Sequence, residues 1–225
     1  MNYTDYFVSS VGSGDENEDS FLSLSHHQTR IDILCDGMSG YGHGKLASES
    51  LLSSINATFN DIVVNKNLHA EKTVHLLLET ADQQILLKRQ DLKSKFGATT
   101  AGLYYQDTEY WVFWIGDVRV YHLRDNQILS CTTDHSLAST ELELDEKNKA
   151  THIVTASISG RGIAKLQTKL LKVKTGDRII ICTDGFWRKA DIREVLDMSD
   201  EDLDQYINKT NLFDDDRSII RFTIA

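Results

Sequence analysis

Two Asp-Gly steps, each following an apolar run, are the residues of this chain best suited to chemistry. Asp36-Gly37 follows the run 31–35, and Asp184-Gly185 follows the run 179–183. A carboxylate at the end of a buried strand, followed by a glycine that lets the backbone turn sharply, is a common way to direct a ligand at a metal ion. The two steps lie far apart in the sequence, so they can share a site only if the fold brings their strands together. We expect one such shared site.

Other acidic residues stand beside expected turns or strand ends, namely Glu18, Asp19, Asp117, Asp134, Asp214, Asp215 and Asp216. Oxygen ligands of this kind select divalent ions such as Mg²⁺ or Mn²⁺. Two such ions carry a charge of about +4, and four carboxylates would match it: Glu18, Asp36, Asp184 and Asp215. A single aspartate at a turn is more often a cap than a ligand. Together, these acids predict a dinuclear centre of the kind used for phosphate-ester hydrolysis.

Hydrophobic periodicity predicts the elements that would position these acids. It favours strands over residues 6–11, 20–25, 30–35, 99–105, 109–115, 118–123, 127–131, 152–157, 168–173, 177–182 and 217–224. Helical spacing predicts long helices through 47–59 and 74–85, a shorter one near 189–197, and another that begins at the cap Ser199. Strands in runs, with helices grouped between them, favour an α+β fold. We expect two mostly antiparallel sheets packed as a sandwich, with helices on the outside.

The composition limits the classes of protein to which this chain can belong. Its 225 residues are 40% hydrophobic and carry a net charge of −10, which argues against a general nucleic-acid binder. No apolar run reaches the roughly 18 residues of a membrane span, and the first residues do not resemble a signal peptide. The three cysteines form no CxxC pair, and no linker-like stretch divides the chain. We expect a single domain over 1–225 in the cytoplasm, without a nucleic-acid or membrane partner.

The order of the acidic motifs resembles that of the metal-dependent protein phosphatases of the PP2C (PPM) family, especially the compact bacterial type. The resemblance runs from about Gly12 to Ile224 and rests on segments 17–20, 36–48, 97–100, 116–121, 134–137, 184–187 and 215–219. It implies a four-layer αββα sandwich in which the metal ions lie in a cleft at one end of the two sheets. One such match would be a weak signal, whereas seven in the right order are a strong one.

The resemblance also implies which residues hold metal. Asp36 would bridge two Mn²⁺ or Mg²⁺ ions. Asp184 and Asp215 would complete the first site, and Glu18 and the Gly37 carbonyl would help to hold the second. These five residues come from four separate motifs, so the fold has to assemble the centre.

Catalytic roles follow from the same resemblance. Asp36 and Asp184 would act through the metal ions, and Asp19 would orient a metal-bound water that attacks phosphorus without a covalent phosphoenzyme. Asp117, with Asp184, falls where bacterial members can hold a third ion. The implied enzyme is a protein-serine/threonine phosphatase whose substrate is a phosphorylated protein and whose partner is a Ser/Thr kinase.

Several positions depart from the family pattern. Gly14 stands where the family has an arginine that grips the substrate phosphate by a charge-assisted, bidentate contact. Lys45 and Arg161 are candidates to take its place. Asp216 replaces an asparagine, which we expect to add negative charge beside the first metal site. The segment 136–152, the mobile flap of the family, is short.

These departures leave three functions open. The first is a metal-dependent serine/threonine protein phosphatase, which retention of every expected metal carboxylate favours. The second is a pseudophosphatase, a binding or regulatory module without useful catalysis, which the missing arginine favours. The third is hydrolysis of a small phosphorylated metabolite or of an unusual phosphoprotein.

Overall fold

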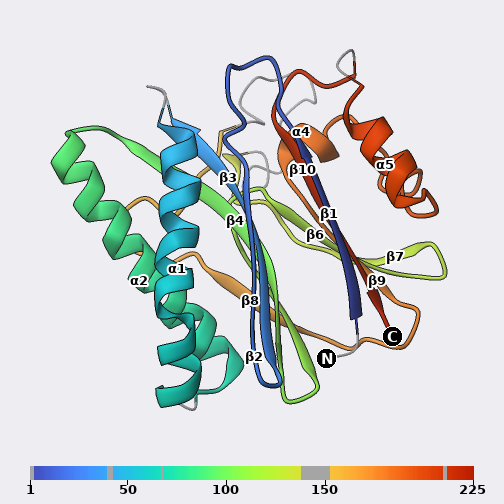
Figure 1. Cartoon of the computed structure of the whole chain (residues 1–225), viewed down its shortest axis with the longest axis horizontal. Coiled ribbons are helices and arrows are strands. Elements are labelled where there is room, and N and C mark those ends of the chain that lie inside the picture. Colours follow the sequence, from blue (N-terminus) through green and yellow to red (C-terminus); the bar gives the residue numbers. More distant parts are fainter. Residues whose placement is uncertain (1–2, 40–42, 67, 138–152, 210–211) are drawn as a thin grey trace.

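Ten strands form two five-stranded antiparallel sheets that pack face to face (Figure 1). The computed structural model describes residues 3–39, 43–66, 68–137, 153–209 and 212–225. The number of strands is given for these residues. The first sheet has the order β1 (Tyr3–Ser10), β10 (Arg217–Ile224), β9 (Arg178–Cys182), β6 (Arg119–Arg124) and β7 (Gln127–Cys131). The second has the order β2 (Ser20–His26), β3 (Thr29–Ser39), β4 (Phe96–Gln106), β5 (Glu109–Ile115) and β8 (Gln167–Leu171).

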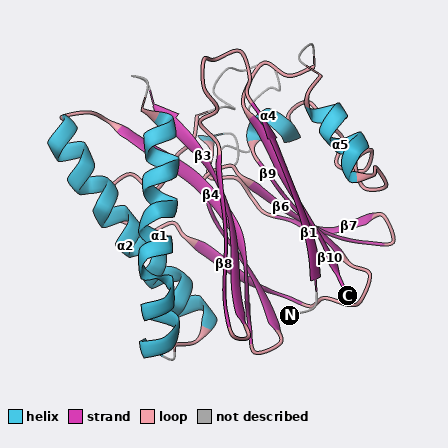
Figure 2. Ribbon diagram, viewed as in Figure 1, coloured by secondary structure: helices cyan, strands magenta, loops and turns pink. Residues whose placement is uncertain are grey.

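Helices cover the outer faces of both sheets (Figure 2). The second sheet carries the two long helices, α1 (Gly44–Lys66) and α2 (Ala70–Leu92), and the first sheet carries α4 (Asp184–Trp187) and α5 (Asp200–Ile207). One hydrophobic core lies under α1 and α2, a second lies between the sheets, and a third lies under α4 and α5. The predicted α+β sandwich is confirmed. Among the described residues, no helix is both long and apolar enough to cross a membrane.

The strand β5 shows how the apolar pattern specifies these layers. Both of its faces are apolar, which predicts that the strand is covered on both sides. Phe113 and Ile115 pack into the core under α1 and α2, whereas Val112 and Trp114 pack between the sheets. Successive residues of β5 therefore alternate between the two cores. The prediction that this strand is covered on both sides is confirmed.

Two predicted elements are wrong. Residues 189–197 form turns and not a helix, and the Asp191 side chain accepts a hydrogen bond from the Arg193 N–H, a turn interaction that competes with helix. The strand expected over 152–157 is absent from its described part, 153–157, where Val154 makes an isolated bridge, and Ile158 just beyond makes another. The amides that follow, at residues 159, 160 and 162, bind the Asp82 carboxylate and not a neighbouring strand. The helix expected after Ser199 is confirmed, since the Ser199 hydroxyl caps the Asp202 N–H at 3.1 Å.

Asp177, just before β9, is a buried carboxylate that joins three chain segments. Its oxygens accept hydrogen bonds from the Arg124 guanidinium at 2.7 Å, from His122 Nε2 at 2.8 Å and from the Lys174 backbone N–H at 2.9 Å. Burial raises the pKa of Asp177, but these hydrogen bonds outweigh burial and hold the pKa well below its usual range. The carboxylate is therefore more stable ionised in the folded chain than in the unfolded chain.

We expect this cluster to make the free energy of unfolding sensitive to acid. Because the folded-state pKa of Asp177 is depressed, its contribution is present above the ordinary carboxyl pKa of about 4. The contribution is lost as pH falls toward the depressed value. Asp177→Asn should lose about 3 kcal/mol of stability at neutral pH and should respond less to acid than the parent chain. Urea unfolding at stepwise lower pH measures both effects, and an equal acid response of the two proteins would contradict this account.

Candidate metal centre

Asp36 lies inside β3 and not at the end of a strand. β3 continues to Ser39 and stays paired with β4 to that point. The expectation that Asp36-Gly37 ends a strand is therefore wrong. Gly37 is needed for close approach, because a Cβ there would lie 2.1 Å from the Gly44 carbonyl oxygen. The absence of a side chain lets the start of α1 pack directly against β3.

Asp184 stands where β9 gives way to α4. Thr183 is the N-cap, and Asp184 is the first helical residue, so this Asp-Gly step does follow a strand. A Cβ on Gly185 would lie 2.0 Å from the Asp216 carbonyl oxygen, so this glycine also permits close approach. The two carboxyl groups lie near enough that the Asp184 charge raises the pKa of Asp36. The structure thus brings the two distant steps to one place.

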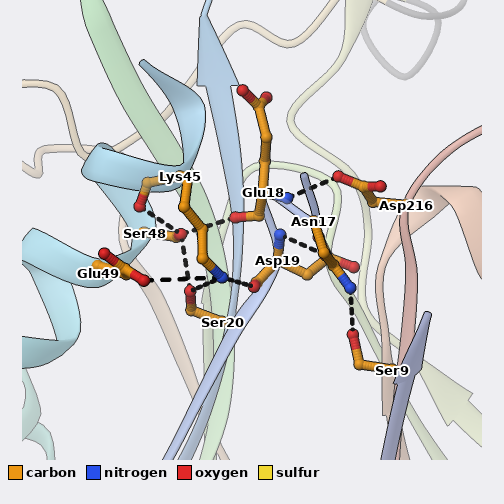
Figure 3. A network of polar contacts seen from close by, with 9 residues as sticks. All are labelled: Ser9, Asn17, Glu18, Asp19, Ser20, Lys45, Ser48, Glu49 and Asp216. Carbon is orange, nitrogen blue, oxygen red and sulfur yellow. Dashed lines mark hydrogen bonds and ion pairs between the residues drawn. The ribbon is translucent and has the colours of Figure 1, made fainter. Parts of the chain in front are cut away.

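Glu18 is fixed against the start of α1. Its Oε1 accepts a hydrogen bond from the Gly44 N–H at 3.2 Å, and a Cβ on Gly44 would lie 2.1 Å from the other carboxylate oxygen. Its carbonyl oxygen accepts hydrogen bonds from the Gly37 N–H at 3.3 Å and from the Ser48 hydroxyl at 2.6 Å. Figure 3 shows the Glu18 carboxylate pointing away from the Lys45 ammonium group. Three hydrogen bonds therefore hold this residue beside β3.

Asp19 is buried behind Glu18. Its Oδ2 accepts hydrogen bonds from the hydroxyls of Thr183 at 2.9 Å and Ser218 at 2.7 Å. Its Oδ1 is buried and has no hydrogen-bond partner among the described residues. Burial raises the pKa of Asp19 to about 7, although the two hydroxyls oppose the shift. One oxygen is thus held firmly while the other is left to accept a hydrogen bond.

Asp216 is the residue that we expect to add negative charge beside the first metal site. Both of its carboxylate oxygens accept hydrogen bonds. Oδ1 accepts a hydrogen bond from the Gly12 N–H at 2.7 Å. Oδ2 accepts one from the Glu18 N–H at 2.6 Å, which Figure 3 shows. An asparagine could accept through one oxygen only. Asp216 therefore anchors the segment that carries Glu18, while its neighbour Asp215 stays exposed.

We expect Asp216→Asn to lower the free energy of unfolding by about 1–2 kcal/mol. The asparagine side chain has one oxygen and one NH₂ group, so one of the two backbone N–H groups faces a donor and loses its acceptor. Urea unfolding measures the loss. Asp214→Asn is the matched control, since Asp214 is exposed and, among the described residues, its side chain pairs only with Lys189, at 3.0 Å. Its effect should stay below about 0.5 kcal/mol. Equal stability of the two variants would show that the Asp216 hydrogen bonds do not anchor the segment.

Arg188 contacts two of the acids expected to bind metal. Its Nη2 lies 2.7 Å from Asp184 Oδ2 and 3.6 Å from Asp117 Oδ2. Sequence reasoning missed this residue, although its position four residues after Asp184 at the start of a helix is a signal for an ion pair. A guanidinium group therefore already stands between the two carboxylates expected to share a third ion.

The remaining carboxylates raise one another's pKa. Burial raises the pKa of Asp36 well above its usual range, and the nearby Asp19 and Asp184 charges add to the effect. Burial and the Asp184 charge raise the pKa of Asp117 to about 7, against the opposing charge of Arg188. Burial also raises the pKa of Asp184. A cluster of this kind is destabilised by its own charge and would be neutralised by cations.

Trp187 holds the backbone of Asp117, and Arg119 stacks on the Trp187 ring. The Arg119 guanidinium pairs with Asp134 through two contacts, at 3.0 and 2.8 Å, and lies 3.4 Å from the centre of the Trp187 ring. The Trp187 indole N–H donates a hydrogen bond to the Asp117 carbonyl at 2.9 Å. Asp134, one of the candidate acids, thus supports the site through Arg119.

The donors suit hard divalent ions, because they are buried or partly buried carboxylates from separate strands and loops. In the structure, however, protein groups and not metal ions are the partners of these carboxylates. Among the residues it describes, no three Asp, Glu, His or Cys side chains are grouped so that they would hold one ion as they stand. Asp184 is paired with Arg188, and Glu18 accepts a hydrogen bond from the Gly44 amide. Among the described residues, Asp19 Oδ1 is the buried carboxylate oxygen that has no hydrogen-bond partner.

The sequence model of the protein phosphatase 2C family matches residues 8–215. The chain belongs to this family. It is 24% identical over 208 residues to the protein phosphatase PhpP of Streptococcus pneumoniae, a match that covers 87% of this chain and 84% of PhpP. It is also 24% identical over 200 residues to the serine/threonine phosphatase stp of Listeria welshimeri, covering 81% of this chain and 79% of that protein.

Solved phosphatase structures share the fold. The serine/threonine phosphatase of S. agalactiae superposes with a TM-score of 0.84 at 20% identity, covering 99% of this chain and 100% of that one. The catalytic domain of the phosphatase PstP, solved in complex with two manganese ions, superposes with a TM-score of 0.78 at 18% identity, covering 100% of this chain and 99% of that one. The chain is thus a protein phosphatase 2C hydrolase by family and by fold.

Within this protein phosphatase 2C fold, the two candidates for gripping phosphate lie in different places. The Lys45 ammonium donates hydrogen bonds to the Asp19 carbonyl at 2.9 Å and to the Ser20 hydroxyl at 3.3 Å, so it supports the chain behind the acids (Figure 3). Arg161 lines a separate pocket beside the end of β3. Gly14 is exposed, and a Cβ there would meet nothing closer than 3.7 Å. The expected flap falls largely outside the described residues.

Proposed function

We propose that this chain removes phosphate from phosphoserine and phosphothreonine in proteins, using two Mn²⁺ or Mg²⁺ ions. The observation that carries the proposal is the closeness of Asp36 and Asp184, two partly buried carboxyl groups from distant motifs whose charges interact, inside a protein phosphatase 2C fold. Relatives named as serine/threonine phosphatases support the substrate, and the two manganese ions of PstP support the metal. A Ser/Thr kinase is the partner that such a reaction requires.

The residues that would hold the ions all reach one end of the sandwich. Asp36 would bridge the two ions, Asp184 and Asp215 would complete one site, and Glu18 and the Gly37 carbonyl would contribute to the other. When bound, the ions supply the positive charge that activates a water molecule and stabilises the phosphoryl group in the transition state.

The remaining roles belong to side chains and backbone of this chain. Thr183 and Ser218 fix Asp19 Oδ2, so Oδ1 is directed to accept a hydrogen bond from the attacking water. Asp216 and Ser48 fix the backbone of Glu18, which keeps its carboxylate beside β3. Asp19 therefore positions the nucleophile, and Asp216 positions a ligand.

Hydrolysis of 4-nitrophenyl phosphate and of a phosphothreonine peptide, each with Mn²⁺ and with EDTA, tests the proposal. Metal-dependent release of phosphate from both substrates is the expected result. If neither substrate turns over, the proposal is wrong. Turnover of the aryl phosphate alone would instead favour a small phosphorylated metabolite as the substrate.

A pseudophosphatase that binds phosphoproteins without useful turnover is the second candidate. Two observations favour it. Gly14 leaves the phosphate without its arginine, and Arg188 occupies Asp184 at 2.7 Å. Binding of a phosphothreonine peptide without hydrolysis, in the presence of Mn²⁺, would select this candidate.

We expect Arg188→Gln to bind Mn²⁺ about tenfold more tightly than the parent chain, because the guanidinium competes with metal for Asp184 and repels it from Asp117. Isothermal titration with Mn²⁺ measures the affinity and the number of ions bound. Arg193→Gln, a change at an exposed arginine near Asp191, should leave both unchanged. An unchanged or weaker affinity in Arg188→Gln would show that Arg188 does not compete with metal.

A further inference from the structure

A pocket of about 350 Å³ at the end of β3 is lined by three cationic side chains, Arg89, Lys95 and Arg161. The hydroxyl-bearing residues Ser157 and Ser159 complete its polar wall. Within the described part of the chain, none of the three cations forms an ion pair with a carboxylate. In a protein with a net charge of −10, three such cations around one hollow favour a negatively charged ligand.

A buried carboxylate builds the wall of this pocket. Asp82 of α2, which is 5% exposed, accepts hydrogen bonds from the backbone N–H groups of Ser159 at 3.0 Å, Gly160 at 2.6 Å and Gly162 at 2.8 Å. Two turns further along the same helix, Arg89 donates a hydrogen bond to the Ser159 carbonyl. The loop that carries Arg161 is therefore fixed to α2 at two points before any ligand binds.

Glycines bring this loop against the sheet and the helix. A Cβ on Gly97 would lie 2.8 Å from the Ile158 carbonyl oxygen, so the loop packs directly on the start of β4. Gly160 has a φ of +72°, and a Cβ there would lie 2.6 Å from the Leu86 Cα. The pocket is thus a packed feature of the fold and not a gap between mobile side chains.

The pocket lies next to the proposed metal centre. Met38 lines it and stands two residues beyond Asp36 on the same face of β3. Two residues of a strand span about 7 Å, and an extended peptide covers about 7 Å from one residue to the second along and about 10 Å to the third. A substrate whose phosphate lies at Asp36 can therefore place a neighbouring side chain in the pocket.

We propose that this pocket binds a second anionic side chain of the phosphoprotein substrate, a carboxylate or a phosphate, two or three residues from the residue that is dephosphorylated. The inference rests on the proposed function, because it assigns a substrate class to the same site. Arg161 supplies a planar, bidentate donor, Lys95 supplies a point charge, and Arg89, which also holds the Ser159 carbonyl, adds the positive charge of its guanidinium. Charge-assisted hydrogen bonds of this kind change affinity by about 10- to 100-fold.

Phosphothreonine peptides that carry Glu, phosphoserine or Gln at one position, moved stepwise along both sides of the phosphothreonine, test this. The variant is Lys95→Gln/Arg161→Gln, which changes two exposed residues and spares Arg89. The control is Lys72→Gln/Arg193→Gln, which changes one exposed lysine and one exposed arginine outside the pocket. The readouts are kcat/KM with Mn²⁺, and peptide affinity by isothermal titration with EDTA, where turnover is excluded.

The parent and the control should prefer the Glu and phosphoserine peptides over the Gln peptide by about 10- to 100-fold, and the variant should lose this preference. Because 4-nitrophenyl phosphate carries no second anion, the parent and the control should hydrolyse it equally. A parent without the preference, or a variant that keeps it, would overturn the inference. If no protein turns over any substrate, the proposed function fails. In that case, tighter binding of the anionic peptides to the parent than to the variant still supports an anion-binding pocket. Equal binding to both proteins overturns the inference.

Discussion

Replacing Asp36 by asparagine is expected to lower metal-dependent phosphatase activity by about a thousandfold or more. The side chain would bridge both ions, and the loss of metal-supplied charge removes several kcal/mol of transition-state stabilisation, with about 1.4 kcal/mol for each tenfold. Hydrolysis of 4-nitrophenyl phosphate with Mn²⁺ measures the effect. Residual activity near that of the parent chain would show that Asp36 does not bridge the ions.

In the absence of metal, Asp36→Asn should be at least as stable as the parent chain. The raised pKa of Asp36 means that its charge is disfavoured in the folded chain, so a neutral amide of the same shape removes an unfavourable interaction. Urea unfolding with EDTA should therefore give an equal or higher free energy of unfolding than for the parent chain. With Mn²⁺, the parent should gain stability by mass action and the variant should not.

Asp32→Asn is the matched control for Asp36→Asn. Asp32 is a fully buried carboxylate on the same strand, but its oxygens accept hydrogen bonds from the Tyr3 hydroxyl at 2.6 Å and from Arg30 at 2.8 Å. Its substitution should destabilise the fold with or without Mn²⁺ while leaving activity per folded molecule unchanged. Opposite behaviour of two aspartates four residues apart would separate a functional carboxylate from a structural one.

The layers of the fold could be predicted because local pattern and tertiary packing agree. The apolar stripes of Ala47 to Phe59 and of Val74 to Ile85 become the buried faces of α1 and α2, and Ile220, Phe222 and Ile224 share the inner face of β10. The pattern failed at 189–197 and 152–157. Val195 in the first segment, and Ile158 directly after the second, are buried from irregular backbone, so burial occurs there without a helical or strand period.

The members of the site could be predicted from sequence better than their contacts. Motif order points to Asp36 and Asp184 together, and in the structure they lie near enough for the Asp184 charge to raise the pKa of Asp36. No sequence pattern shows that Asp216 accepts two backbone N–H groups, since its partner Gly12 is over two hundred residues away in the chain. Gly37 illustrates the same limit, because a glycine required for close approach looks like one required for a turn.

Restoring an arginine at Gly14 is expected to raise kcat/KM for phosphothreonine peptides by about 10- to 100-fold, the value of a bidentate, charge-assisted contact to phosphate. The position is exposed, four residues before Glu18, and a Cβ there meets no atom closer than the Glu16 carbonyl oxygen at 3.7 Å. The substitution therefore introduces a cation without disturbing the packing. Initial rates with Mn²⁺ over a range of peptide concentrations measure the gain.

Gly14→Gln is the control for chain length without charge, and Gly14→Lys is the control for charge without the planar fork. The expected order of kcat/KM is Arg, then Lys, then Gln, with Gln equal to the parent chain. Combining Gly14→Arg with Asp36→Asn should abolish the gain, because a phosphate grip is useful only where the phosphoryl group reacts. Equal rates for the arginine and glutamine variants would show that the substrate phosphate does not pass this position. The grip would then have to come from elsewhere in the site, with Arg188 the nearest guanidinium to Asp184 among the described ion pairs.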